Sequence, residues 1–372
     1  MHTQTHPIAT EQSVATYQLT SLHYGSPGAG KKVYIQAALH ADEIPAMLVA
    51  QFLRRELERL DAQGRVRGEL ILVPAANPVG LSQVVQGTPF GRFDLSTGTN
   101  FNRSFPYLVD GLKTALAGRL GSDSAANVAA IRAEARAAIA HWEPADHTEV
   151  LKKTLLGMAI DADIVLDLHC DNEAVLHLYA GSALADRVKP LAALLGARAL
   201  LLSDASGGDP FDEACSRLWW DLAAHFGPAT PIPPACAAIT VELRGEMDVR
   251  YDLAEQDATA LLQFLAREGV LDIPLLPLPD ALCEPTPLEG VEPLRAPQSG
   301  LLVLLKRLGE RVSAGEAVAD VVNPVTGATA TVRAGHDGLL FASTAHRHLL
   351  RGMHICKIAG AAAFRSGSLL SQ

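Results

Sequence analysis

The sequence predicts an α/β domain, a short extended linker and a small all-β module. Three observations support this fold class. Up to about Leu271, short apolar runs alternate with segments of helical periodicity. Prolines then recur from Pro274 to Pro297, where a helix cannot continue. Beyond Gly300, short β-type runs are separated by glycines. The predicted units are an α/β domain at 1–272, a Pro-rich linker at 273–298 and a C-terminal β domain at 299–372.

In the first domain, residues 33–39 form a short apolar run that is typical of a buried strand. Pro45 then opens a helix, since proline is favoured at the first helical position. The other expected strands are 70–73, 164–169, 199–203 and 237–243. The other expected helices are an Ala-rich inserted helix at 124–141 and helices around 185–196, 210–226 and 252–268. Alternation of this kind favours a mostly parallel sheet with helices on both faces.

The C-terminal module contains two segments with a loose common pattern, at 300–321 and 338–358. Each begins with Gly-Leu-Leu and has a glycine before its closing strand. Its expected strands are 301–305, 317–322, 328–332 and 339–342. We interpret the module as a pseudo-symmetric, barrel-sandwich-like fold.

Composition narrows the classes of function. The chain has 372 residues, of which 48% are apolar and 19% charged, as in an ordinary globular protein. Its formal charge of −10 disfavours nucleic acid and anionic membranes as partners. No apolar run of about 18 residues could span a bilayer, and the N-terminus has no signal-peptide pattern. The five cysteines include no CxxC pair, which fits reduced thiols. We expect a cytoplasmic protein with a small-molecule substrate, and a homo-oligomer is compatible with the sequence.

The strongest local feature is the segment His40-Ala41-Asp42-Glu43, which follows a buried strand and precedes a helix. Ligand sites of open α/β sheets form at the carboxyl ends of strands. A turn there can bring His40 and Glu43 onto one metal. Alternatively, Asp42 and Glu43 only stabilise the helix N-terminus.

A second feature, Asp167 and His169, lies near the end of the expected strand 164–169. Alternation along a strand sends both side chains to the same face, so Asp167 can orient the imidazole. His40, Glu43 and His169 would make a three-ligand zinc site with a water in the fourth position. Asp171 and His177 are alternative ligands, and His169 could instead be a core histidine tied to a carboxylate.

Glu242 interrupts the apolar strand 237–243, where an unpaired carboxylate is costly. Near a metal it can accept a proton from water and pass it to a leaving amine. The alternative interpretation is a structural ion pair with Arg244.

A Gly/Asn/Pro-rich loop at 98–106 contains Asn102 and Arg103. Arg103 could hold a substrate carboxylate through two parallel hydrogen bonds. Arg92 could polarise the scissile carbonyl.

Taken in order, these residues resemble the succinylglutamate desuccinylase/aspartoacylase family of the zinc carboxypeptidase superfamily. The matching strings are HADE at 40–43, NFNRSFP at 100–106, DLHCD at 167–171 and VELRG at 241–245. The resemblance spans roughly 31–271. It implies a zinc-carboxypeptidase-like mixed sheet flanked by helices. The β module after the linker would then correspond to the C-terminal β domain that is typical of the family. It implies one zinc ion per chain.

By this resemblance His40, Glu43 and His169 would be the zinc ligands and Glu242 the catalytic base. Asn102 and Arg103 would bind the substrate carboxylate, and Arg92 would polarise the carbonyl.

The expected function is a zinc-dependent hydrolase that cleaves the amide bond of a small N-acyl amino acid, or a related carboxylate-bearing amide, by metal-activated water. One alternative is a metallocarboxypeptidase acting on short peptides. Another is a non-catalytic carrier or binding protein, because the C-terminal module resembles biotinyl and lipoyl carrier domains. Its expected hairpin tip at 323–330 contains no lysine, which argues against a carrier role.

Overall fold

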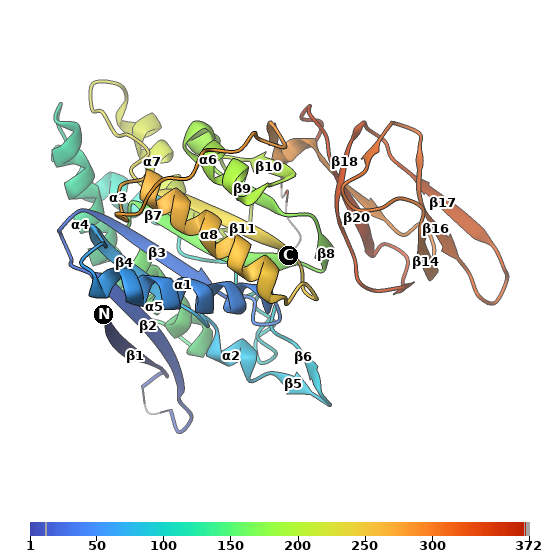
Figure 1. The fold of residues 1–372 in the computed structure, drawn as a ribbon, viewed down its shortest axis with the longest axis horizontal. Helices are drawn as coiled ribbons and strands as arrows, with labels where there is room; N and C mark the ends of the chain where they lie inside the picture. The colour runs from blue at the N-terminus through green and yellow to red at the C-terminus, as the bar shows by residue number, and fades with distance from the viewer. Residues whose placement is uncertain (12, 368, 370–372) are drawn as a thin grey trace.

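The computed structural model describes residues 1–11, 13–367 and 369. Within these residues, one large mixed sheet of nine strands runs through the molecule, with helices packed on both of its faces (Figure 1). Its strand order is β1-β2-β4-β3-β7-β11-β9-β10-β12. The strands are β1 (His2–Ile8), β2 (Tyr17–Gly25), β4 (Gly68–Val73), β3 (Lys31–Ala37), β7 (Ile164–Asp171), β11 (Ala237–Gly245), β9 (His177–Ala180), β10 (Ala199–Leu202) and β12 (Pro285–Pro287).

The middle of the sheet is parallel, and its edges make it mixed. β4, β3, β7 and β11 run parallel to one another, as do β9, β10 and β12. β9 is antiparallel to β11, and the hairpin of β1 and β2 joins β4 in antiparallel orientation. The mixed α/β sheet that the resemblance implies is therefore confirmed. The N-terminal hairpin and β9 were not predicted.

Two groups of helices cover the two faces of the sheet. Apolar side chains of α1, α6 and α8 share one core cluster, whereas those of α3, α4, α5 and α7 share the other. The helices are α1 (Pro45–Ala62), α2 (Pro78–Leu81), α3 (Val109–Leu116), α4 (Ser124–His141), α5 (His147–Ala159), α6 (Ala185–Leu195), α7 (Phe211–Phe226) and α8 (Tyr251–Arg267). The described part of the chain has no helix with the length and hydropathy needed to cross a membrane.

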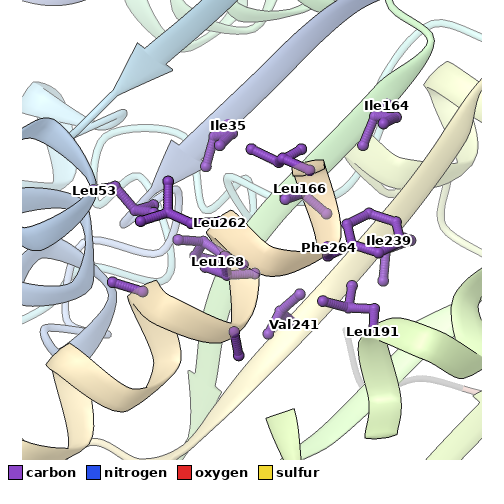
Figure 2. Packing of buried hydrophobic residues seen from close by; sticks show 14 of the residues in the cluster. Ile35, Leu53, Ile164, Leu166, Leu168, Leu191, Ile239, Val241, Leu262 and Phe264 are labelled. Atoms are coloured by element: carbon purple, nitrogen blue, oxygen red, sulfur yellow. The ribbon is translucent and has the colours of Figure 1, made fainter. Parts of the chain in front are cut away.

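Alternation along the central strands assigns each side chain to one face. Leu166 of β7 and Val241 of β11 pack with Leu262 of α8 in the first core cluster (Figure 2). The residues next to Leu166 and Val241 along each strand therefore face the opposite side of the sheet. Asp167, His169 and Glu242 are on that opposite side, near the carboxyl ends of their strands.

Two strands lie within the Pro-rich segment that sequence analysis describes as a linker. β12 (Pro285–Pro287) pairs with β10 and extends the large sheet at its edge, where a proline needs no ladder partner for its nitrogen. β13 (Val291–Arg295) pairs with a strand of the C-terminal part.

The strands that follow β12 form two antiparallel sheets at one end of the molecule (Figure 1). One has the order β13-β20-β18-β15, and the other has the order β17-β16-β14-β19. The strands are β14 (Gly300–Leu304), β15 (Arg311–Val312), β16 (Ala317–Val322), β17 (Thr329–Arg333), β18 (Gly338–Ser343), β19 (His348–Leu349) and β20 (His354–Ala359). The predicted module runs to residue 372, and residues 368 and 370–372 lie outside the described residues. The division at 272 and 298 and the barrel-sandwich assignment stay predictions.

The C-terminal sheets pack against the carboxyl end of the large sheet. β8 (Glu173–Ala174), which follows β7, pairs with β18. Phe341 and Leu288 share an apolar cluster with Leu201 of β10. Lys357 of β20 and Asp171 of β7 form an ion pair of 2.5 Å. These contacts place β18 and β20 beside the ends of β7 and β11, where the candidate site lies.

Candidate metal and active site

The first site segment lies in the turn between β3 and α1. Ala38 has φ = 60°, a left-handed conformation that few residues other than glycine adopt. The chain turns there, and the Glu43 amide donates to the His40 carbonyl at 3.2 Å. This turn lets both side chains point to one place before α1 begins at Pro45.

His40, Glu43 and His169 meet at this place. One carboxylate oxygen of Glu43 lies 2.7 Å from Nδ1 of His40, and the other lies 2.7 Å from Nδ1 of His169. One potential ligand atom from each residue lies within 4.8 Å of the others. All three side chains are buried. The structure therefore brings the expected trio together in a group that could hold a metal ion.

The far nitrogen of each imidazole has an oxygen partner. Nε2 of His40 is 2.9 Å from Oδ1 of Asn100, and Nε2 of His169 is 2.9 Å from Oδ2 of Asp167. A proton on each Nε2 would face these oxygens and leave each Nδ1 free to bind a metal. Asp167 thus has the orienting position expected from strand alternation, and Asn100 is an orienting residue that sequence analysis missed.

Asp167 is itself held by a buried chain of hydrogen bonds. Nε2 of Gln36 donates to Oδ1 of Asp167 at 2.8 Å, and the Tyr34 hydroxyl donates to Oε1 of Gln36 at 2.9 Å. The register of β3 and β7 pairs Gln36 with Asp167. Gln36 was also missed, although a glutamine inside an apolar strand, on the face of a neighbouring polar strand residue, is a signal that could have found it.

The charges of the trio depend on one another. Burial would raise the pKa of Glu43, but His40 and His169 lower it well below its usual value. Burial would lower the pKa of His169, but Asp167 and Glu43 raise it well above its usual value. Burial, together with Arg92, lowers the pKa of His40. A cation bound between these side chains would take the place of the proton on Nδ1 of His169 and keep Glu43 anionic.

Glu242 lies directly beside the trio. The register of β7 and β11 pairs its Cα with that of His169, on the same face of the sheet. Oε2 of Glu242 is buried and has no hydrogen-bond partner among the described residues. Burial, with Glu43 as the next cause, raises the pKa of Glu242 to about 8. This carboxylate can therefore hold a proton near neutral pH.

Arg244 does not pair with Glu242. Its guanidinium forms two hydrogen bonds of 2.8 Å with Asp257 of α8. A bulge lies between Glu242 and Gly245, and Arg244 has φ = 69°. This irregular backbone turns Arg244 towards α8, so the interpretation of Glu242 as its structural ion-pair partner is wrong.

The alternative ligands Asp171 and His177 have other partners. Asp171 pairs with Lys357, and Nδ1 of His177 is 2.8 Å from the carbonyl of Val175. Among the described residues, the group that could hold a metal contains neither of them.

The loop at 98–106 borders the trio. Oδ1 of Asn102 accepts a hydrogen bond of 2.9 Å from the Phe211 amide, and its Nδ2 lies 3.4 Å from Nε2 of His169. Arg103 donates to the Asn102 carbonyl at 2.6 Å. The buried ammonium of Lys152 donates to the Arg103 carbonyl at 2.6 Å and so holds the loop in place.

Arg92 reaches the trio from another loop. Its Nη1 lies 3.4 Å from Oε1 of Glu43 and 3.3 Å from Nδ1 of His40. All of the predicted site residues thus lie around one point in the structure.

That point is the floor of a cavity of ≈ 280 Å³. The trio, Glu242, Arg92, Asn102 and Arg103 all line it. Residues of β18, β20 and the adjoining C-terminal chain also line it: Ala342, Ser343, Thr344, His354, Ile355, Cys356 and Lys357. The site is therefore built by both parts of the chain.

The donor set fits a divalent transition metal. Two imidazole nitrogens and one carboxylate are a ligand combination that zinc accepts, and a three-ligand set leaves room for a water or a substrate atom. The unpartnered Oε2 of Glu242 lines the same cavity, next to that open side.

Residues 29–129 match the model of the succinylglutamate desuccinylase/aspartoacylase catalytic domain. The resemblance to this family is thereby confirmed, and the matched residues include the turn with His40 and Glu43 and the loop with Asn102 and Arg103.

Solved structures of this group share the fold over almost the whole chain. A candidate succinylglutamate desuccinylase/aspartoacylase family protein from Shewanella amazonensis is 25% identical, with a TM-score of 0.82, covering 96% of this chain and 98% of its own. A candidate succinylglutamate desuccinylase/aspartoacylase from Shewanella frigidimarina is 24% identical, with a TM-score of 0.83 and coverages of 96% and 97%. The ectoine utilization protein EutE from Ruegeria pomeroyi is 19% identical, with a TM-score of 0.65 and coverages of 96% and 94%. None of the curated proteins matches the chain.

Proposed function

We propose that this protein is a zinc-dependent amide hydrolase that removes an acyl group from a small carboxylate-bearing substrate. One observation carries the proposal. A buried group of two histidines and a glutamate, able to hold a metal, lies in a cavity beside the Glu242 carboxylate, whose Oε2 has no hydrogen-bond partner among the described residues. This is the minimum set for hydrolysis without a covalent intermediate: a metal site, a proton carrier and a space for one small amide.

His40, Glu43 and His169 would hold the ion. Zinc bound there supplies Lewis acidity, which polarises a carbonyl group and makes a water molecule more acidic. Asp167 and Asn100 keep the imidazoles in one tautomer, so that both Nδ1 atoms face the ion.

Glu242 would carry the proton. Its free Oε2 can take a proton from the attacking water, and its raised pKa lets the carboxyl group keep that proton until the amine leaves. The parallel pairing of β7 and β11 fixes this carboxylate beside His169.

The two arginines would act on the substrate. Arg103, steadied by Lys152 through its carbonyl, would bind the substrate carboxylate together with Asn102. Arg92 would face the oxygen on which negative charge develops, since its guanidinium already lies within 3.4 Å of the trio.

The partly enclosed cavity favours this function over cleavage of peptides. A carboxypeptidase needs an open groove for the chain that precedes the cleaved bond, whereas β18 and β20 wall this cavity. The cytoplasmic location and the small-molecule substrate stay predictions from the sequence.

The test compares turnover of N-acetyl, N-succinyl and N-formyl amino acids by zinc-loaded wild type and Glu242→Gln. We expect the substitution to lower kcat by about 100-fold to 10,000-fold because it removes the proton carrier. Bound zinc should be unchanged, because Glu242 is not part of the trio. Glu255→Gln, on the exposed surface of α8, is the matched control.

Wild-type turnover by Glu242→Gln would refute the assigned base. Failure of the zinc-loaded wild type to hydrolyse any of the amides would refute the proposed function.

A further inference from the structure

A second group of polar side chains lies in the same cavity, away from the trio. Asp212 and Glu213 occupy the first turn of α7, and Ser203 follows the end of β10. All three line the cavity, with exposed fractions of 9%, 8% and 8% respectively. We call these three residues the acidic lobe.

The acidic lobe contains hydrogen-bonding atoms without partners. Oε2 of Glu213 and Oγ of Ser203 are buried and have no hydrogen-bond partner among the described residues. The Asp212 carboxylate, in contrast, accepts a hydrogen bond from the backbone amide of Glu213. Unsatisfied buried groups of this kind are costly, so their retention in a cavity wall points to a ligand that satisfies them.

A structural role explains only part of the lobe. Acidic residues in the first turn of a helix are favoured by the helix dipole. Oε1 of Glu213 also holds the Ser206 amide at 2.6 Å. Neither role gives Oε2 of Glu213 or the Ser203 hydroxyl a hydrogen-bond partner among the described residues.

The cationic side chains near the acidic lobe do not fully neutralise its two carboxylates. Arg217 lies 4.0 Å from Oε2 of Glu213, but it pairs more closely with Asp221, at 3.0 Å. Arg103 interacts electrostatically with both Asp212 and Glu213, but it supplies a single positive charge to two carboxylates. Burial, followed by the charge of Glu213, raises the pKa of Asp212 to about 7. A further cation in the cavity would keep both carboxylates ionised.

An aromatic ring completes this part of the cavity. Trp220, two turns after Glu213 on α7, lies against Gly181, and both residues line the cavity. A Cβ atom at Gly181 would come within 2.4 Å of the indole ring, so only glycine lets the ring lie there. Aromatic faces attract ammonium groups.

We propose that the acidic lobe binds a primary ammonium group of the substrate. The inference rests on the proposed function and narrows its substrate class to N-acyl amino acids that carry a second, positively charged amino group. An ammonium has three N–H donors, and the lobe offers Asp212, Glu213 and Ser203 as acceptors. Arg103 would bind the carboxylate of the same molecule.

The test uses three amides of similar length. Nα-acetyl-L-ornithine carries the ammonium, Nα-acetyl-L-norleucine replaces it with a methyl group, and N-acetyl-L-glutamate replaces it with a carboxylate. Binding to the zinc-loaded Glu242→Gln protein is measured by calorimetry, and hydrolysis by the zinc-loaded wild type is measured in parallel. We expect the ornithine amide to bind at least about 10-fold more tightly than the norleucine amide, with the glutamate amide weakest.

The same measurements on Asp212→Asn should abolish this preference and leave binding of the norleucine amide within about threefold. Ser203→Ala, a smaller change, should reduce the preference in the same direction. Asp186→Asn removes an exposed carboxylate of α6 outside the cavity and should keep the preference. Thermal unfolding checks that each variant is folded.

Equal binding of the ornithine and norleucine amides, absence of binding by both, or a preference that survives in folded Asp212→Asn would overturn the acidic lobe as an ammonium site. Selective binding of the ornithine amide with no hydrolysis by the wild type would support the lobe and count against the proposed deacylase function, so the two failures are distinguishable.

Discussion

Glu43 joins the two histidines of the site, and this single carboxylate explains why the trio is compact. Each of its oxygens faces a different Nδ1 atom at 2.7 Å. The oxygens behind the rings, on Asn100 and Asp167, determine which nitrogen faces the centre. Metal affinity should therefore depend on residues that never touch the metal.

Asp167→Asn tests this dependence. The amide can no longer accept a charge-assisted hydrogen bond from Nε2 of His169, so the ring loses its orientation and its basicity. We expect zinc affinity to fall about 10-fold to 100-fold, measured by competition with a chelator of known affinity. Asp186→Asn, at an exposed position on α6, should leave the affinity unchanged. An unaltered affinity in Asp167→Asn would remove the orienting role.

At this scale the sequence predicts the groups that carry the chemistry better than those that support them. His40, Glu43, His169 and Glu242 stand in segments where a polar residue breaks an apolar pattern. Asn100 lies in a loop, and its contact with His40 spans 60 residues, which no local pattern reveals.

Among the elements, the pairing of β7 with β11 has the greatest influence on the site. It aligns His169 with Glu242 and sends both to the face opposite the α1, α6 and α8 cluster. Ion pairs at the other end of the sheet hold the helical insertion in place. Asp161, which follows α5, pairs with Lys32 of β3 at 2.6 Å and with Arg136 of α4 at 2.8 Å.

Asp161→Asn should reduce the free energy of unfolding by about 1–2 kcal/mol at pH 7, because it removes two charge-assisted hydrogen bonds from a mostly buried carboxylate. Lys32 and Arg136 outweigh the effect of burial and lower the pKa of Asp161 below its usual value. Its contribution is thus complete above the unfolded-state pKa and is lost as the pH falls through the lower folded-state pKa. Denaturant unfolding of wild type and Asp161→Asn at pH 7 and pH 3 measures the loss of stability and its pH dependence. An equal loss of stability at the two pH values would contradict the stabilising role of the Asp161 carboxylate.

Some elements were predicted close to their observed bounds, either from an apolar pattern or, for residues 124–141, from their alanine content. Residues 124–141 and 317–322 match α4 and β16. The hairpin of β1 and β2 was missed because β1 is an exposed edge strand: its segment HTQTHPI has only one buried residue, Ile8. Two-sided exposure removes the alternation by which a strand is recognised.

For the whole molecule, the decisive feature is that both parts of the chain wall one cavity. The pairing of β8 with β18 and the ion pair between Asp171 and Lys357 fix the C-terminal sheets over the site. The sequence predicts a β module, but not which of its faces meets the α/β part, because these contacts join residues more than 160 positions apart.

This enclosure predicts selectivity for size. Zinc-loaded protein should hydrolyse an N-acetyl amino acid at least about 100-fold faster, in kcat/KM, than the terminal bond of an N-acetylated tripeptide with the same final residue. The cavity of ≈ 280 Å³ holds one small amide, and a longer chain would meet β18 and β20. Product analysis by chromatography measures both rates. Equal rates would favour the carboxypeptidase alternative.

The central claim is that His40, Glu43 and His169 together hold one divalent ion. Elemental analysis of protein incubated with zinc and then dialysed tests it most directly, with wild type and His169→Ala measured side by side. We expect about one zinc per chain in the wild type and almost none in the folded variant, because a site that loses one of three ligands holds zinc far more weakly. Wild-type protein that retains no zinc, or a His169→Ala variant that retains as much as wild type, would contradict the claim.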